Sequence, residues 1–300
     1  MKNNYSRKKK DHCVSSDIKS SSFLFRFPRV LSVTSGKGGV GKTSFTLNLA
    51  FALTRLGQKV LVLDGNLGLG NIDVLLGLTP KFTIEDFFCH GKSFQEILLQ
   101  DPNGISIIPA GSGIPELVTL TDDQKISLLN ELDVITVKTN FMLIDTAPGI
   151  SSNVLYFNMV AQESIVVVTP EPTSTANAIV LIRILSRKHR KKHFDILVNL
   201  AANENEAREL FKKIILTTDR FLGNLSIGYL GFVPFDNKMS VALRSQKLVL
   251  KAYPESSSSK SIRELAKTIL ERPVLNKDRG SLHFFRRQFY FNHVSAQFNS

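Results

Sequence analysis

The stretch TSGKGGVGKTSF (residues 34–45) decides the fold of this chain. Its centre, GKGGVGKT (36–43), matches the phosphate-binding pattern G-x-x-x-x-G-K-[ST] at each fixed position. An apolar run precedes the pattern and a segment rich in Leu and Ala follows it, which predicts a strand, a loop and a helix in that order. Glycines let backbone N–H groups converge on phosphate oxygens at the start of such a helix. The residues expected to contact a nucleotide here are Gly36, Lys37, Gly38, Gly39, Val40, Gly41, Lys42, Thr43 and Ser44.

A second motif supports the first. In the loop, Lys42 is expected to reach the β- and γ-phosphates, and the Thr43 hydroxyl to bind Mg²⁺. The segment FMLIDTAPG (141–149) is an apolar run that ends in Asp145, an arrangement that holds Mg²⁺ through a carboxylate at the end of a strand. Gly149 would be the hinge of a loop that senses the γ-phosphate. A glycine-rich turn without a ligand and an acid that only caps a helix are the alternatives, and the pair of motifs disfavours both.

The rest of the chain alternates apolar runs with helical stretches. The runs are near-continuously apolar, as in strands that are buried on both faces. They lie at 30–35, 59–64, 105–110, 141–146, 164–170, 194–200 and 226–234, and the helical stretches lie at 42–57, 122–133, 174–192, 203–222 and 258–271. This alternation predicts an α/β fold: a single P-loop NTPase domain over residues 29–271, with a mostly parallel sheet and helices on both faces.

Charge is concentrated near the ends of the chain. The net charge is +12, yet residues 1–30 hold eight Lys and Arg against two Asp, and residues 271–300 hold five against two acids. We expect residues 1–28 to form a flexible basic arm and residues 272–300 to form an aromatic-basic tail. This distribution favours contact with an anionic partner through the ends of the chain over a wholly basic DNA-binding surface.

The composition also indicates the cellular compartment. Cys13 and Cys89 are the two cysteines, and their spacing gives no disulfide framework, zinc site or iron–sulfur site within the chain. The basic N-terminus is not followed by an apolar segment of the kind found in secretion signals. No run approaches the roughly 20 apolar residues that span a bilayer. We therefore expect a cytoplasmic protein that is soluble or peripherally attached to a membrane.

The loop KGGVGKT, with its additional Lys37, resembles the deviant Walker A loop of the MinD/ParA (SIMIBI) class of P-loop ATPases. In that class ATP lies between two subunits, and the early lysine reaches the phosphates of the partner. The resemblance implies an ATP-dependent homodimer with ATP and Mg²⁺ as ligands, in which Lys37 and Lys42 both act on phosphates. The alternative is that Lys37 is a solvated loop lysine.

Five further stretches are similar to the flagellar-number regulators FlhG/FleN, a MinD-like branch. They are VLDGNLGLGNIDVLLGL (62–78), ISIIPAGSG (105–113), LIDTAPGIS (143–151), VVTPEPTSTANA (167–178) and GYLGFVPFD (228–236). The resemblance covers roughly residues 29–271. It implies a regulator of flagellar number or placement at the cell pole, with an FlhF-type GTPase and flagellar switch-complex proteins as partners. It also implies peripheral attachment to the inner face of the cytoplasmic membrane when ATP is bound.

The chain departs from this family at the catalytic acids. Family members read Asp-x-Asp where this chain reads Asp64-Gly65-Asn66, and their second Asp positions and activates the attacking water. Asn66 can orient a water through its carbonyl oxygen but cannot take a proton. An amide can still serve, as glutamine does in small GTPases. We expect ATP binding with slow or negligible ATPase activity, and Asp64 as a partial substitute if the loop shifts.

The N-terminal arm and the adenine contacts carry weaker signals. The arm reads KDHCVSSDIKSS (10–21) where FlhG proteins usually carry a DQAxxLR element, so activation of a GTPase through that element is not expected. Asn199, Pro234 and Asp236 lie at the ends of late strands, where an α/β sheet places its ligand, and the resemblance makes them expected nucleotide contacts. Their alternative is an ordinary turn.

Two basic segments suggest a surface role. MinD-like proteins end in a short amphipathic helix that docks on lipid, and LHFFRRQFYF (282–291) occupies that position. Its candidate membrane residues are Leu282, Phe285, Arg286, Arg287 and Phe289. The alternative is a tail that packs against the body or is unstructured. The segment RILSRKHRKKH (183–193) is interpreted as the solvated basic end of a helix, with lipid or partner contact second and nucleic acid disfavoured.

The sequence therefore indicates an Mg–ATP-dependent dimerising switch of the FlhG type. One rival is a scaffold locked in the ATP-bound state, for which Asn66 is the evidence. A second is a ParA- or MinD-like positioning ATPase that acts on DNA or on the division site. A third, a small-molecule ligase that uses the same loop, is disfavoured because no further acid–base cluster stands out.

Overall fold

The computed structural model describes residues 28–273 apart from 112, 114 and 224. Within them, eight strands form one sheet in the order β3-β4-β2-β5-β1-β6-β7-β8. The strands are β1 (Arg29–Thr34), β2 (Val60–Gly65), β3 (Leu99–Gln100), β4 (Ser106–Ile108), β5 (Phe141–Thr146), β6 (Glu163–Val168), β7 (His193–Ala201) and β8 (Ser226–Pro234). Neighbouring strands pair in parallel except β3 with β4, which pair antiparallel. The predicted α/β fold with a mostly parallel sheet is confirmed.

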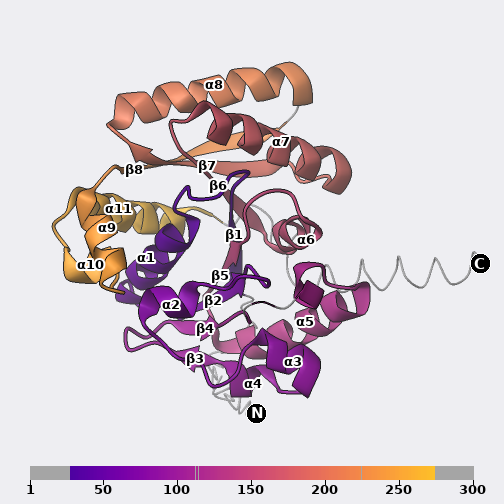
Figure 1. Cartoon of the computed structure of the whole chain (residues 1–300). Helices are drawn as coiled ribbons and strands as arrows, with labels where there is room; N and C mark the ends of the chain where they lie inside the picture. Colours follow the sequence, from indigo (N-terminus) through magenta and orange to yellow (C-terminus); the bar gives the residue numbers. More distant parts are fainter. Residues whose placement is uncertain (1–27, 112, 114, 224, 274–300) are drawn as a thin grey trace, which may run out of the picture.

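Helices cover both faces of this sheet (Figure 1). They are α1 (Lys42–Arg55), α2 (Ile72–Leu76), α3 (Ile84–His90), α4 (Phe94–Ile97), α5 (Asp122–Ile135), α6 (Ser152–Val160), α7 (Pro172–His189), α8 (Glu204–Leu222), α9 (Asn237–Arg244), α10 (Val249–Ala252) and α11 (Ser257–Glu271), with short 3-10 turns at Pro115–Val118 and Thr136–Lys138. The five predicted helices are present. The helix expected at 174–192 ends earlier, at His189, because Arg190 takes a left-handed backbone conformation with φ 55°.

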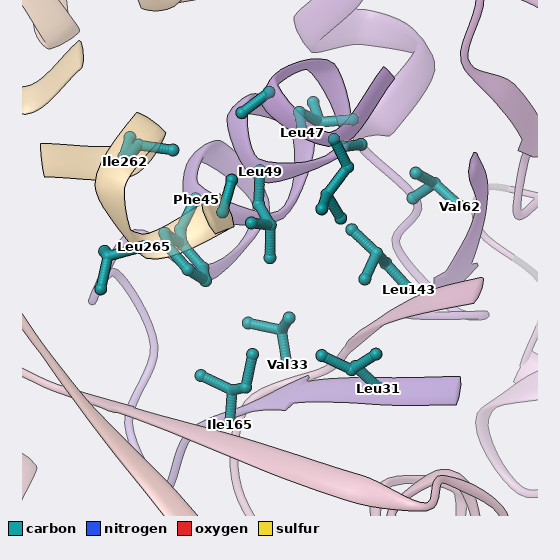
Figure 2. Close-up of a cluster of buried hydrophobic side chains, with 14 of the residues drawn as sticks. Leu31, Val33, Phe45, Leu47, Leu49, Val62, Leu143, Ile165, Ile262 and Leu265 are labelled. Atoms are coloured by element: carbon teal, nitrogen blue, oxygen red, sulfur yellow. The ribbon is translucent and has the colours of Figure 1, made fainter. Parts of the chain in front are cut away.

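The continuous apolar strands pack on both faces, as their composition predicts. Side chains alternate along a strand, so Val60 and Val62 of β2 contact one core cluster while Leu61 and Leu63 contact another. The first cluster joins α1 and α11 to the sheet, and Figure 2 shows it. The labelled residues there are Leu31, Val33, Phe45, Leu47, Leu49, Val62, Leu143, Ile165, Ile262 and Leu265.

The opposite face is covered in two parts. Helices α3, α4, α5 and α6 pack over β2, β4 and β5, where Phe94 and Phe157 are among the largest buried side chains. Helices α7 and α8 pack over β6 and β7 around Phe194. This three-layer arrangement leaves the carboxyl ends of the parallel strands along one edge of the sheet, which is where such folds place their ligands.

Helix α11 is fastened to the amino ends of the central strands. Arg29, the first residue of β1, pairs with Glu163 at a separation of 2.7 Å between Nη2 and Oε2, and both are buried. The Arg29 Nη1 also donates to the carbonyl oxygens of Ile269 and Arg272, the latter at 3.2 Å. Arg272 in turn donates to Asp195 Oδ1 and to the carbonyl of Tyr229 on β8.

Helix α11 contacts β8, the last strand of the sheet. Ser261 of α11 donates through Oγ to the carbonyl oxygen of Phe232, as Arg272 does to that of Tyr229. Among the described helices, none is both long and apolar enough to cross a membrane. The candidate membrane residues at 282–291 lie outside the described part of the chain.

Candidate functional site

The loop between β1 and α1 has the backbone conformation of a phosphate cradle. Gly39 and Gly41 have φ of 75° and 86°, in the left-handed region that a side chain disfavours. A Cβ at Gly41 would also lie 2.4 Å from Nδ2 of Asn199, so a side chain there would displace the Asn199 amide. The conformation and the close approach together explain why glycine occupies position 41, directly before the first turn of α1.

Lys42 is the first residue of α1 and is buried, with 7% of its surface exposed. Its Nζ donates to Oγ of Ser35 at 2.9 Å, across the mouth of the loop. Burial lowers the pKa of Lys42, and the nearby Asp145 carboxylate opposes that effect. A buried ammonium that is held by one hydroxyl retains donors for an anion in the same loop.

Thr43 and Asp145 lie together although they are far apart in the sequence. Thr43 Oγ1 donates to Asp145 Oδ2 at 2.6 Å, and Thr46 Oγ1 lies 3.3 Å from Oδ1. Burial raises the pKa of Asp145 to about 6, against the hydrogen bond from Thr43 and the charge of Lys42, which lower it. A hydroxyl and a carboxylate side by side are oxygen ligands of the kind Mg²⁺ prefers, so these residues fit the expected ion.

Asp64 is a buried neighbour of Asp145. The two residues are register partners on β2 and β5. The Asp64 carboxylate accepts backbone N–H bonds from Asn66, Asn71 and Ile72, at 3.1, 3.0 and 3.3 Å. Burial raises its pKa to about 7, and the charge of Asp145 adds to the rise. The sequence suggested a possible catalytic substitute; the structure shows Asp64 holding both ends of the 66–71 loop.

Asn66 is tied into its own turn. Its side-chain Nδ2 donates to the carbonyl oxygen of Leu69 at 2.6 Å, and its backbone N–H donates to Asp64. The side chain is partly exposed. Its amide oxygen is the group left to orient a water, and an amide oxygen does not act as a base.

Lys37 forms an ion pair that the sequence did not predict. Its Nζ contacts Oε2 of Glu171, and both side chains are partly exposed. Glu171 precedes α7 and lies at the carboxyl end of β6, next to β1. No sequence signal joins two residues that lie 134 positions apart. The loop lysine is therefore neither buried nor free in this state of the chain.

Of the three candidate adenine contacts, Asn199 lies against the loop. It ends a buried stretch of β7, and its Nδ2 donates to the carbonyl oxygen of Val40 at 2.8 Å. Pro234 is the last residue of β8. Asp236 caps α9 through Lys238 N and accepts hydrogen bonds from the backbone N–H and hydroxyl of Ser258 at the start of α11. Its predicted nucleotide contact stays a prediction.

A pocket of about 590 Å³ opens at this edge of the sheet. It lies at the carboxyl ends of β6, β7 and β8 and is lined by Thr169, Pro170, Glu171, Leu200, Ala202, Glu206 and Phe235. Leu200 has φ 60°, a left-handed conformation that is rare for a leucine. Glu171 lines this pocket and also pairs with Lys37, so the pocket and the phosphate loop adjoin.

Comparison with known proteins assigns the family. A ParA-family model, described as NUBPL iron-transfer P-loop NTPase, matches residues 26–270. The antiactivator FleN of Pseudomonas aeruginosa is 40% identical over 257 residues, which cover 86% of this chain and 91% of FleN. The chain belongs to the ParA/MinD family of P-loop NTPases. Membership of the ParA/MinD family supports a role as a positioning ATPase.

Two further ParA/MinD relatives agree. The flagellum site-determining protein YlxH of Helicobacter pylori is 26% identical over 244 residues, 81% of this chain and 82% of YlxH. The structure of the septum site-determining protein MinD from Pyrococcus horikoshii, complexed with Mg-ADP, superposes with a TM-score of 0.69 at 22% identity, covering 81% of this chain and 96% of MinD. The ParA/MinD fold therefore extends over nearly all of the described residues.

Proposed function

We propose that this protein is an ATP-dependent dimerising switch that regulates flagellar number or placement at the cell pole. The observation that carries the proposal is the complete phosphate loop, with Lys42 buried and Thr43 beside Asp145, in a chain 40% identical to FleN. The adjoining pocket supplies space for a nucleoside next to that loop.

The residues divide the work of binding. The backbone N–H groups of 37–43 and the start of α1 would hold the phosphates, and Lys42 would exchange its Ser35 contact for a phosphate oxygen. Thr43 and Asp145 would hold Mg²⁺, which when bound neutralises phosphate charge and orients the phosphates. Lys37 would leave Glu171 and reach the phosphates of a second copy of the chain.

Hydrolysis by this site should be slow. Asn66 has no group that accepts a proton, and its amide nitrogen is held by Leu69. Asp64 is already committed to three backbone N–H groups. The ATP-bound dimer would therefore be long-lived and would attach peripherally to the inner face of the cytoplasmic membrane through the tail residues 282–291. An FlhF-type GTPase and flagellar switch-complex proteins are its proposed partners.

A second candidate function, a scaffold locked in the ATP-bound state, is favoured by the same Asn66 geometry. One experiment separates the two. Steady-state ATP hydrolysis is measured with anionic liposomes for the wild type, Asn66→Asp and Lys42→Ala, beside ATP binding by each.

For the switch, we expect slow wild-type turnover above the Lys42→Ala background, and Asn66→Asp at least about tenfold faster because a general base is restored. Wild-type activity equal to that of Lys42→Ala, with ATP still bound, would establish the scaffold. Equal rates for the wild type and Asn66→Asp would show that Asn66 is no defect.

The dimer is tested separately by analytical ultracentrifugation with ATP and Mg²⁺. Lys37→Ala should bind ATP as a monomer and fail to dimerise, because its lysine would complete the partner's site. Glu171→Ala is the matched control, since it removes the other half of the Lys37 ion pair and should leave dimerisation intact. Dimerisation of Lys37→Ala at the ATP concentration that dimerises the wild type would refute the proposed role of Lys37.

A further inference from the structure

The edge of the sheet opposite the phosphate loop carries exposed cations. In a parallel α/β sheet each helix returns the chain to the edge where strands begin, which we call the amino edge. Lys59 and Lys192 directly precede β2 and β7, and Lys138 precedes β5 by three residues. Arg55 ends α1, and Lys188 and Arg190 lie at the end of α7. These six exposed residues, Arg55, Lys59, Lys138, Lys188, Arg190 and Lys192, form the amino-edge rim.

Among the described residues, the rim cations have no acidic partners. Within residues 28–273, none of the six makes an ion pair, whereas Arg208, Lys212 and Lys267 each pair with a glutamate on the same helix. In the same part of the chain, Arg183 and Lys213 are exposed without an ion pair as well, so the rim is distinguished by its six cations at one edge. The acids on strands at this edge are already used, because Glu163 pairs with Arg29 and Asp195 with Arg272. Positive charge at the rim is therefore left for an outside partner.

Helix dipoles account for only part of this charge. Basic residues in the last turn of a helix are favoured by its negative end, which explains Arg55 and Lys188. Lys59 and Lys192 lie outside helices, at the entries of strands. Their backbones are fixed: Asn140 N donates to the Lys59 carbonyl, and Ser226 N donates to the Lys192 carbonyl, each at 2.8 Å. The side chains are thus exposed on a rigid base.

Apolar side chains are exposed beside the rim. Val134 at the end of α5 and Val137 in the following turn are 60% and 57% exposed, and Lys138 follows them. Phosphates of a nucleic acid would leave such valines in water. A lipid surface offers anionic headgroups to the lysines and an acyl boundary to the valines.

Both ends of the chain join the body at this edge. Arg29 donates to the Arg272 carbonyl at 3.2 Å, so the attachment points of residues 1–28 and 273–300 lie within the reach of one side chain. Residues 1–28 carry seven Lys and Arg against two Asp, and residues 273–300 carry four against one. The most basic segments of the chain are therefore attached where the rim is.

We propose that the amino-edge rim is a docking surface for an anionic lipid membrane. It would contact headgroups directly while the phosphate loop, at the opposite edge, faces away from the lipid and remains accessible to a second copy. The proposal rests on the proposed function in one respect, that the ATP-bound chain attaches to the membrane. The rim itself is a contact made by the folded body.

The test measures binding of the full chain, with ATP and Mg²⁺, to vesicles of equimolar phosphatidylethanolamine and phosphatidylglycerol. Each lysine near an anionic surface strengthens binding about fivefold, so Lys59→Glu with Lys192→Glu should lower vesicle partitioning at least about tenfold. The control double variant, Arg183→Glu with Lys213→Glu, makes the same charge change at exposed positions on α7 and α8 and should stay within about twofold of the wild type.

The outcomes are separable. Wild-type protein that fails to bind these vesicles with ATP would overturn membrane attachment as a whole. Wild-type binding with equal binding by the rim double variant would overturn the rim proposal and leave the proposed function intact. Intact vesicle binding with loss of salt-sensitive binding to duplex DNA would make the rim a nucleic-acid surface. Unchanged ATP affinity and Tm show that the variant is folded, and Lys59→Gln with Lys192→Gln replaces it if they change.

Discussion

At the scale of single residues, the carboxyls of Asp64 and Asp145 destabilise the folded protein when both are charged. Two carboxyls on adjacent strands are buried, and the charge of the buried Lys42 acts on one of them, Asp145. Burial favours the neutral form of each carboxyl, so both titrate well above their ordinary pKa, near 7 and 6. A divalent cation held by these residues would stabilise their charged forms, because it would offset the missing solvation.

The metal-free protein should therefore lose stability as pH rises. A carboxyl whose pKa is raised on folding contributes stability that is fully present below its unfolded pKa of 3.8 and is lost as pH rises through about 7. Asp64→Asn keeps an acceptor oxygen without this titration. In urea unfolding without Mg²⁺, the free energy of unfolding of Asp64→Asn relative to that of the wild type should rise by a few kcal/mol between pH 4 and pH 8. Parallel pH curves would contradict this account.

Single residues also show what the sequence predicted. The phosphate-loop pattern and the acid after an apolar run selected Thr43 and Asp145, which the structure places 2.6 Å apart. Lys37 was selected as well, but its ion pair with Glu171 was not, because a contact across 134 positions leaves no local pattern. The buried pair of Arg29 and Glu163 escaped for the same reason.

Long helices and strands were predicted from the sequence more often than short ones. In Phe141–Thr146, four consecutive apolar residues precede Asp145, and such a run indicates a buried strand. Helices α2, α4 and α10 have only four or five residues, too few for a 3.6-residue period to show. Helix α6, with the sequence SNVLYFNMV, is apolar on most sides and so lacks an amphipathic pattern, since it packs between the sheet and its neighbours.

The start of α11 yields a prediction at the scale of elements. Asp236 accepts hydrogen bonds at the starts of α9 and α11. Partial desolvation raises the pKa of Asp236. The hydrogen bonds from Ser258 and Lys238 outweigh this effect and lower the pKa to about 2. A carboxyl with a lowered pKa contributes stability above its unfolded pKa of 3.8 that is lost as pH falls through about 2. Asp236→Ala should cost about 1–2 kcal/mol at pH 7, measured by urea unfolding.

The same variant tests the predicted adenine contact of Asp236. If the carboxylate only joins the two helices, ATP affinity should change by less than about threefold, measured by titration calorimetry. Asn199→Ala is the comparison, because it removes the hydrogen bond to the Val40 carbonyl and should weaken ATP binding by about tenfold. A larger loss of ATP affinity for Asp236→Ala than for Asn199→Ala would show that Asp236 contacts the nucleotide.

At the scale of the whole molecule, one buried ion pair joins β1, β6 and α11. Arg29→Met should destabilise the protein by about 3–5 kcal/mol in urea unfolding, because Glu163 is left buried without its partner. Glu163→Met should cost a similar amount. Arg29→Met combined with Glu163→Met should cost less than Arg29→Met alone, since no charge is then stranded. Additive losses would show that the pair is not coupled.

The contacts of α11 with β8 have a consequence for solubility. An outer strand with free carbonyl groups is a template on which another chain can add a strand. The Tyr229 and Phe232 carbonyls of β8 accept bonds from Arg272 and Ser261 instead, and β3 closes the opposite border with a strand of only two residues. Both borders of the sheet thus resist edge-to-edge polymerisation, so the folded chain can reach a high local concentration without forming fibres.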